Sequence, residues 1–248
     1  MNETNRSQPK SLIPSQWAVP AKFRARVGES VGRQRQMLDE GHLLLVLHEV
    51  PEPGESERRG RFFWRDKQGA WRSSSHGSGV GGLREHVAEF ERAVDGLEER
   101  LRSAKAAKDF FAVLQAATPL HRTSRNLTRT LQEAREAVDD RELINLRDRA
   151  NEVERGAELC VSEARDGLEF TSAQNAEQQA ALSLELARDS HKLNVITAVF
   201  LPITALASIF SMTLHSGLEG VGEPWVFWLI VAAGIALGTA MRRNLTPR

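Results

Sequence analysis

The residue types that most often carry chemistry are scattered along this sequence rather than clustered. His42 and His48 share one face of a predicted strand, but two ligands do not make a metal site. The glycine-rich stretch 76–82 lacks the Lys-Ser/Thr pair of a phosphate-binding loop, so we interpret it as a flexible joint. With no nucleophile elbow either, the sequence predicts no enzyme and no resident cofactor. The histidines stand at 42, 48, 76, 86, 121, 191 and 215, and the single cysteine at 160.

Two long apolar segments near the C-terminus dominate the sequence. Residues 193–214 and 225–241 contain no charged side chain. Each reaches the roughly 17–25 apolar residues that a membrane-crossing helix needs. We therefore expect a transmembrane hairpin, with a first helix over 193–214, an external loop over 215–224 and a second helix over 225–241. The alternative, two buried helices of a soluble protein, is disfavoured because such helices rarely run so far without a charge.

Charged residues around the hairpin predict its orientation. Basic side chains precede the first segment, at Arg188 and Lys192, and return in the tail 242–248, whereas the loop carries only Glu219 and Glu223. Because basic flanks stay on the cytoplasmic side, we expect both termini inside a cell (inner) membrane and the acidic loop outside. Repeated around a ring, Glu219 and Glu223 would concentrate cations at the outer mouth.

Composition narrows the class further. The 248 residues include 33 basic and 33 acidic side chains, and this zero net charge argues against a nucleic-acid partner. One cysteine allows no intramolecular disulfide, which agrees with a reducing compartment. No apolar stretch follows the polar residues 1–10, so we expect no cleaved signal peptide and membrane targeting by the C-terminal segments.

The N-terminal part of the chain predicts a small sheet. Residues 1–40 are polar and proline-containing, which indicates a flexible arm. Within 41–79, the apolar run 42–50 and the aromatic-rich runs 61–66 and 70–74 predict three strands. Such a sheet is too small to be stable alone and needs helices on one face.

The middle of the chain predicts long helices. Apolar residues recur at three- and four-residue steps through 80–138, which indicates a cytoplasmic helical hairpin whose second helix begins at Pro119. A further stripe of small residues, including Cys160, predicts a stalk helix over 139–192 with coiled-coil-like contacts. No proline lies between Arg141 and Leu201, so we expect the stalk to continue into the first apolar segment.

The first apolar segment and its flanks, HKLNVITAVFLPITALASIFSMTL, resemble the signature of the CorA family of divalent-cation transporters. That signature runs close to K-x-L-T, F-x-P-L-T and G-I-Y-G-M-N. The corresponding stretches here are 192–197, 200–204 and 208–213. The resemblance implies a mostly α membrane protein with a small cytoplasmic α/β domain, a long helical stalk and a C-terminal two-helix transmembrane hairpin.

The resemblance also implies a function and a site. The protein would be a homo-oligomer, a pentamer in the family pattern, that sits in the lipid bilayer and passes divalent cations, foremost Mg²⁺. One broad face of the first transmembrane helix would line the pore. On that face we expect selectivity and pore residues Thr213, Met212, Ser211, Thr204 and Leu201, a hydrophobic gate at Leu193 and Leu201, and a cytoplasmic pore at Ser190 and Ala187.

One departure from the family pattern keeps a second reading open. Where the family has Gly-Met-Asn, this chain has Ser211-Met212-Thr213. In the family the asparagine oxygen meets a hydrated Mg²⁺, an ion that keeps most of its waters, and Thr213 offers a hydroxyl of shorter reach. The alternative is a membrane-anchored oligomeric effector or scaffold of the same architecture without selective Mg²⁺ transport, in which the pore residues are ordinary helix contacts.

Overall fold

The computed structural model describes residues 12–28, 30–52, 58–75, 79–211, 225, 228–229 and 231–236. The chain divides into two compact units, Met1–Ala173 and Gln174–Arg248, hereafter the first and second units. The first unit holds a small sheet and a helical bundle, and the long helix α4 begins in it and continues into the second unit.

The sheet of the first unit is an antiparallel meander of four strands in the order β1-β2-β3-β4. The two-residue turn between the first two strands has positive φ at both Glu40 and Gly41, the conformation that a tight hairpin requires. The sequence predicted three strands, and the structure adds one before them, inside the stretch expected to be an arm. The strands are β1 (Arg35–Asp39), β2 (His42–His48), β3 (Gly60–Arg65) and β4 (Trp71–Ser73).

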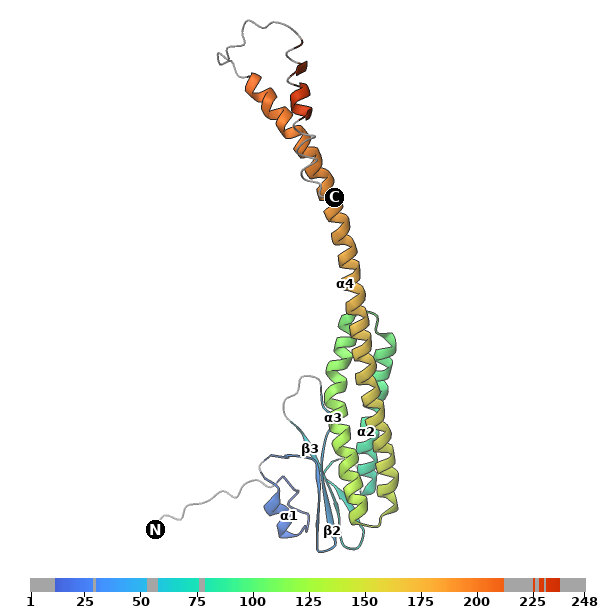
Figure 1. The fold of residues 1–248 in the computed structure, drawn as a ribbon. Coiled ribbons are helices and arrows are strands. Elements are labelled where there is room, and N and C mark those ends of the chain that lie inside the picture. Colours follow the sequence, from blue (N-terminus) through green and yellow to red (C-terminus); the bar gives the residue numbers. More distant parts are fainter. Residues whose placement is uncertain are drawn as a thin grey trace, which may run out of the picture. The chain divides into compact units, whose positions relative to one another are not determined.

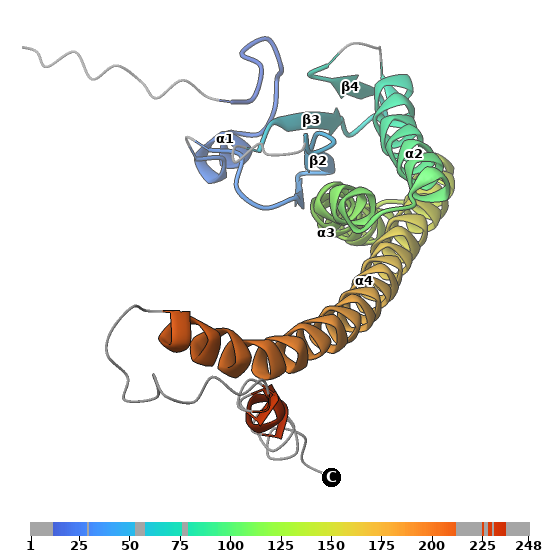
Figure 2. The ribbon, with the colours of Figure 1, turned by 90° about the horizontal axis from the view of Figure 1, so that it is seen from above.

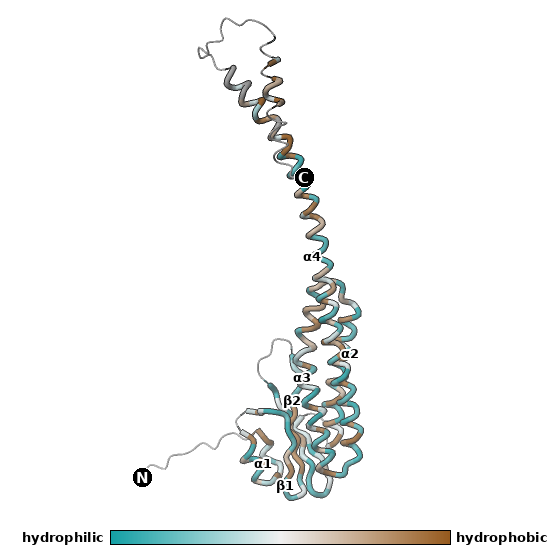
Figure 3. Tube along the Cα trace, in the orientation of Figure 1, coloured by the Kyte–Doolittle hydropathy of each residue, from teal (hydrophilic) through white to brown (hydrophobic). Residues whose placement is uncertain are grey.

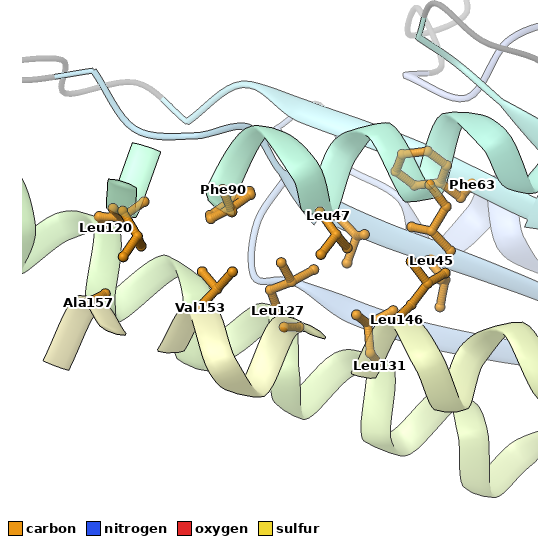
Figure 4. Packing of buried hydrophobic residues seen from close by; sticks show 14 of the residues in the cluster. Leu45, Leu47, Phe63, Phe90, Leu120, Leu127, Leu131, Leu146, Val153 and Ala157 are labelled. Atoms are coloured by element: carbon orange, nitrogen blue, oxygen red, sulfur yellow. The ribbon is translucent and has the colours of Figure 1, made fainter. Parts of the chain in front are cut away.

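Strand β2 is buried on both faces, which explains its unbroken apolar sequence. Successive side chains of a strand point to opposite sides. Leu43, Leu45 and Leu47 therefore join the core beneath the helices, whereas Leu44 and Val46 join a second core on the other face. Figure 4 shows the first of these cores, where Leu45 and Leu47 of the sheet lie beside the helix residues Leu146 and Leu127.

Residues 12–28 cover the second face of the sheet and are not a flexible arm. They include the short helix α1 (Ala21–Arg26), on the opposite side of the sheet from the long helices (Figures 1 and 2). Ile13 and Phe23 are each 1% exposed, and Trp17 packs against Trp64. The expectation of an arm over 1–40 is thus wrong for this part, because a mostly irregular segment shows no apolar period even when its few large side chains are buried.

Three helices cover the first face of the sheet: α2 (Val80–Ser103), α3 (Ala107–Ala137) and the beginning of α4 (Arg141–Ser211). In the first unit they lie side by side, and hydrophobic residues alternate with hydrophilic ones along them (Figures 1 and 3). Their shared core includes Phe90 of α2, Leu127 of α3 and Leu146 of α4.

The helical hairpin turns at residues 104–106 and not at Pro119, which lies inside α3. The Asp109 carboxylate accepts hydrogen bonds from the backbone N–H groups of Ala106 and Lys105, at 3.0 and 3.2 Å. The bond from Ala106 contributes most to lowering the pKa of Asp109, and the bond from Lys105 contributes next. Both bonds hold the start of α3. The predicted start at Pro119 is therefore wrong, because the apolar stripe keeps its spacing across the true break and hides it.

Helix α4 runs unbroken for 71 residues with Pro202 inside it. Its first turn is fixed by Asp140, whose carboxylate accepts bonds from the backbone N–H of Glu142, from Trp71 Nε1 and from Arg65 Nε, each at 3.0 Å. The sequence expectation that the stalk continues past residue 192 into the apolar segment agrees with this helix.

Candidate functional site

Five of the predicted pore residues lie on the described part of α4 and share one side of it. At about 100° per residue, an ideal helix places these five side chains within an arc of roughly 120°. Their spacing on this helix is thus compatible with one broad face, and their role in lining a pore stays a prediction. The five are Ala187, Ser190, Leu193, Leu201 and Thr204, and all are exposed in the single chain.

The remaining predicted site residues fall outside what the structure describes. Met212, Thr213, Glu219 and Glu223 are not among the described residues, and of Ser211 only its helical backbone is described. A step of nine residues is about two and a half turns of an ideal helix. Spacing alone would thus set Thr213 opposite Thr204, so the expectation of one face for both does not follow from helical geometry.

Thr204 puts an oxygen on an otherwise apolar stretch of this face. Its Oγ1 donates to the carbonyl of Phe200 at 2.9 Å, which fixes the rotamer and leaves the oxygen able to accept a further bond. Two residues earlier, Pro202 has no N–H to offer the carbonyl of Ala198, so backbone polarity also increases near this point. Such oxygens can meet the water shell of a cation.

Leu186 belongs to the same face, although the sequence prediction omitted it. It lies within the same arc, is 71% exposed and precedes Leu193 by seven residues, a heptad step that could have identified it. Residues 172–194 are all exposed in the single chain, so exposure by itself does not select a face. The choice of face rests on residue type and spacing.

A polar network in the first unit ties the sheet to α2. Arg61 of β3 donates to Glu49 at 3.0 Å and to Glu89 of α2 at 2.7 Å. Beside it, His86 is fully buried between Phe63 and Phe90. Burial, reinforced by the Arg61 charge, lowers the pKa of His86 to about 3, so the ring is neutral near pH 7. The sequence analysis made no prediction for His86, although its place on the apolar stripe of α2, three residues after Leu83 and four before Phe90, could have identified it as a core residue.

Ion pairs fix α4 to α2. Arg149 donates through Nε and Nη2 to the two carboxylate oxygens of Glu91, at 2.7 and 2.6 Å. The hydrogen bond from Arg149 lowers the pKa of Glu91. Two turns nearer the start of α4, Arg84 Nε donates to Glu142 at 2.9 Å. These contacts, together with the apolar core, hold the first part of α4 in the bundle.

The described residues contain no group of three or more His, Cys, Asp or Glu side chains suited to holding a metal ion. The Nε2 of His48 lies 2.8 Å from the carbonyl of Gly32, so this ring is engaged in the fold and not paired with His42. Cys160 is buried, and burial raises its pKa to about 11, which agrees with the expectation of a core residue. Across the part of the chain that is described, no helix combines the length and the apolar character needed to cross a membrane.

Three solved structures are similar to this chain to different degrees. The cytoplasmic domain of ZntB from Vibrio parahaemolyticus RIMD 2210633 superposes with a TM-score of 0.54 at 14% identity, over 64% of this chain and 80% of that one. The full-length CmaX protein gives a TM-score of 0.47 at 15% identity, over 93% and 83% of the two chains. The CorA magnesium transporter from Methanocaldococcus jannaschii gives 0.39 at 14%, over 91% and 86%. No curated protein matches the sequence.

The fold is therefore that of a mostly helical protein with a small N-terminal sheet and a long helix, like the ZntB cytoplasmic domain. Residues 78–242 match the family described as CorA-like Mg²⁺ transporter proteins, and the chain belongs to that family. The resemblance inferred from the first apolar segment is thereby confirmed, as is the expectation that the protein is not an enzyme. The transmembrane hairpin and the pore residues remain predictions.

Proposed function

We propose that this chain is one subunit of a homo-oligomeric, pentameric channel or transporter that carries divalent cations, foremost Mg²⁺, across the cell (inner) membrane. The observation that supports the proposal best is the continuity of α4, which leaves the helical bundle and runs on to Ser211 without a break. The family match covers the bundle helices and the apolar segments together.

Oligomerisation follows from the proposed function and has support in α4. Two membrane-crossing helices cannot enclose a pore, so several subunits must contribute one helix each. In the single chain Leu182, Leu186 and Leu193 are 60%, 71% and 65% exposed, an unusual amount of apolar surface for one helix. Gathering several copies of α4 around one axis would remove part of this surface from water, including the leucines that face the axis, and would stabilise an assembly.

The proposed ion path uses the arc of residues on α4. Leu193 and Leu201 would form apolar constrictions that close by dewetting, and Thr204 would present oxygens to a hydrated ion between them and the outer mouth. Thr213 would form the outermost polar ring if the chain departs from ideal helical geometry between it and Thr204. Hard cations such as Mg²⁺ keep their waters, so hydroxyl rings that contact the water shell suit such an ion.

The test is flux through the purified oligomer in liposomes. With an ion-sensitive dye inside, the protein should admit Mg²⁺, and Leu193→Ala or Leu201→Ala should raise the rate severalfold because the constriction widens. Leu184→Ala is the matched control, since this leucine is 63% exposed but lies outside the arc. Absence of Mg²⁺, Zn²⁺, Ni²⁺ and Co²⁺ flux in vesicles that contain a verified oligomer would end the proposal.

The replacement of Gly-Met-Asn by Ser211-Met212-Thr213 favours a second candidate, a membrane-anchored oligomeric effector or scaffold without selective Mg²⁺ transport. Under this reading the chain does not rescue a strain deficient in magnesium uptake. The double change Ser211→Gly and Thr213→Asn does not restore rescue either. Growth supported by the unchanged protein would exclude the effector reading and support transport.

A further inference from the structure

A groove with an excess of positive charge lies between α3 and α4 in the first unit, away from the proposed ion path. Its volume is about 600 Å³, within the usual range for small-molecule sites. Arg122, Arg125 and Arg129 of α3 and Arg147 of α4 line it, and Glu154 is the one acidic residue among the lining side chains. We propose that this basic groove binds a small molecule that carries two or more phosphate groups.

The register of the two helices brings the arginines together. Arg122, Arg125 and Arg129 are three or four positions apart, so they share one face of α3. Thr128 Oγ1 donates to the carbonyl of Ala150 at 3.0 Å, which fixes which part of α4 lies opposite. Because the helices are antiparallel, Arg147 lies opposite the Arg129 end of the groove, and Glu154 opposite the Arg122 end.

The positive charge at the Arg129 end is poorly compensated. Glu133 lies 3.8 Å from Arg129 and Asp148 lies 3.0 Å from Arg147, but both carboxylates are about half exposed and neither lines the groove. Ion pairs so exposed contribute little. The Nε of Arg147 is buried and has no hydrogen-bond acceptor among the described residues. The protein thus leaves positive charge at this end of the groove that a bound anion would balance.

The arrangement of donors selects the class of anion. Guanidinium groups present parallel N–H donors that match phosphate oxygens. Arg122 and Arg129 are seven residues apart, roughly 10 Å along the helix, which is more than a single phosphate spans. Asn126 and Asn151 add amide donors between them. No lining residue is aromatic, so the groove recognises the phosphate chain and offers no stacking surface for a nucleobase.

Calorimetric titration of the full chain in detergent, at low salt and with EDTA, tests the site without reference to ion flux. Pyrophosphate should bind at least tenfold more tightly than inorganic phosphate, and ATP should bind much as pyrophosphate does. Arg129→Gln and Arg147→Gln should each weaken pyrophosphate binding roughly tenfold, the effect of losing a charge-assisted hydrogen bond. Added NaCl should weaken binding progressively.

Two further variants separate a specific site from general charge and from misfolding. Arg155→Gln removes an exposed arginine of α4 outside the groove and should leave the affinity unchanged. Glu154→Gln removes the opposing carboxylate and should tighten binding, a gain that loss of structure cannot produce. Equal weakening by Arg155→Gln, no gain from Glu154→Gln, or equal affinity for phosphate and pyrophosphate would overturn the proposal.

Discussion

At the scale of single residues, burial gives His86 a pKa far below that of a free histidine. The ring lies between Phe63 and Phe90 and is neutral in the folded protein because its pKa is near 3. In the unfolded chain a histidine binds its proton near pH 6.5. Between these two values the unfolded state holds more protons, so stability falls as the pH is lowered through this window.

His86→Leu should flatten this acid dependence, because leucine fills a similar space without a titrating group. Between about pH 7 and pH 5 the unchanged protein should lose about 2 kcal/mol more stability than the variant. Urea unfolding followed by circular dichroism at both values measures the difference. His191→Leu, at an exposed position of α4, should leave the dependence of the unchanged protein intact. An equal loss in the His86 variant would contradict the assigned role.

Asp140 is the residue that joins the start of α4 to the sheet. Burial alone would raise its pKa, but hydrogen bonds from Trp71, Glu142 and Arg65 together lower it. Asp140→Ala should cost roughly 2–3 kcal/mol, since a helix cap is lost and two partly buried donors lose their acceptor. Denaturant unfolding measures this cost. The neighbouring Asp139 is exposed, so Asp139→Ala should change stability little; similar costs for both variants would refute the distinction.

At the scale of helices, two glycines should respond to alanine in opposite directions. A Cβ at Gly156 of α4 would lie 2.8 Å from Cγ1 of Val94, a buried and branched side chain of α2, whereas a Cβ at Gly96 of α2 meets nothing within 4 Å. Gly156→Ala should therefore destabilise by about 1–3 kcal/mol through overpacking. Gly96→Ala should stabilise by about 0.5–1 kcal/mol through helix propensity. Thermal unfolding of the two variants checks both signs, and stabilisation by Gly156→Ala would show that α2 and α4 are not held this closely.

The helices also show which elements a sequence can predict. The stalk was predictable because an apolar period and the absence of proline extend over many turns, so one irregular position changes little. Residues 104–106 escaped prediction because three residues with no proline or glycine interrupt the helix while the stripe continues. The docked segment 12–28, which contains α1, was not predicted because it has almost no repeating structure. Its burial depends on a few large side chains such as Trp17 and Phe23. Long helices with a regular apolar period can therefore be predicted from sequence. Short breaks between helices and irregular segments that pack against the sheet cannot.

At the scale of the whole molecule, the candidate ion site was predictable only as far as local spacing reaches. The arc from Ala187 to Thr204 follows from helical geometry, and Leu186 was recoverable from its heptad step to Leu193. The basic groove was not recoverable, because it depends on the register that Thr128 and Ala150 set between two helices. The spacing of residues in a sequence shows which side chains share one face of one helix. The groove is lined by two helices, so its existence also depends on how α4 packs against α3.

The predicted acidic loop, residues 215–224, should affect ion flux only when several subunits assemble around one pore. In one chain Glu219 and Glu223 attract cations weakly, but repeated around a proposed pore they would raise the local cation concentration at its mouth. Replacing both by Gln should lower Mg²⁺ flux severalfold at about 0.01 M ionic strength, where charges act over roughly 30 Å, and should have little effect near 1 M, where they act over roughly 3 Å. Glu169→Gln, at an exposed position of α4 in the first unit, should not change flux at either salt concentration. If the double variant lowers flux equally at both concentrations, the loop carboxylates act by direct contact or through folding, and the ring of charge is rejected.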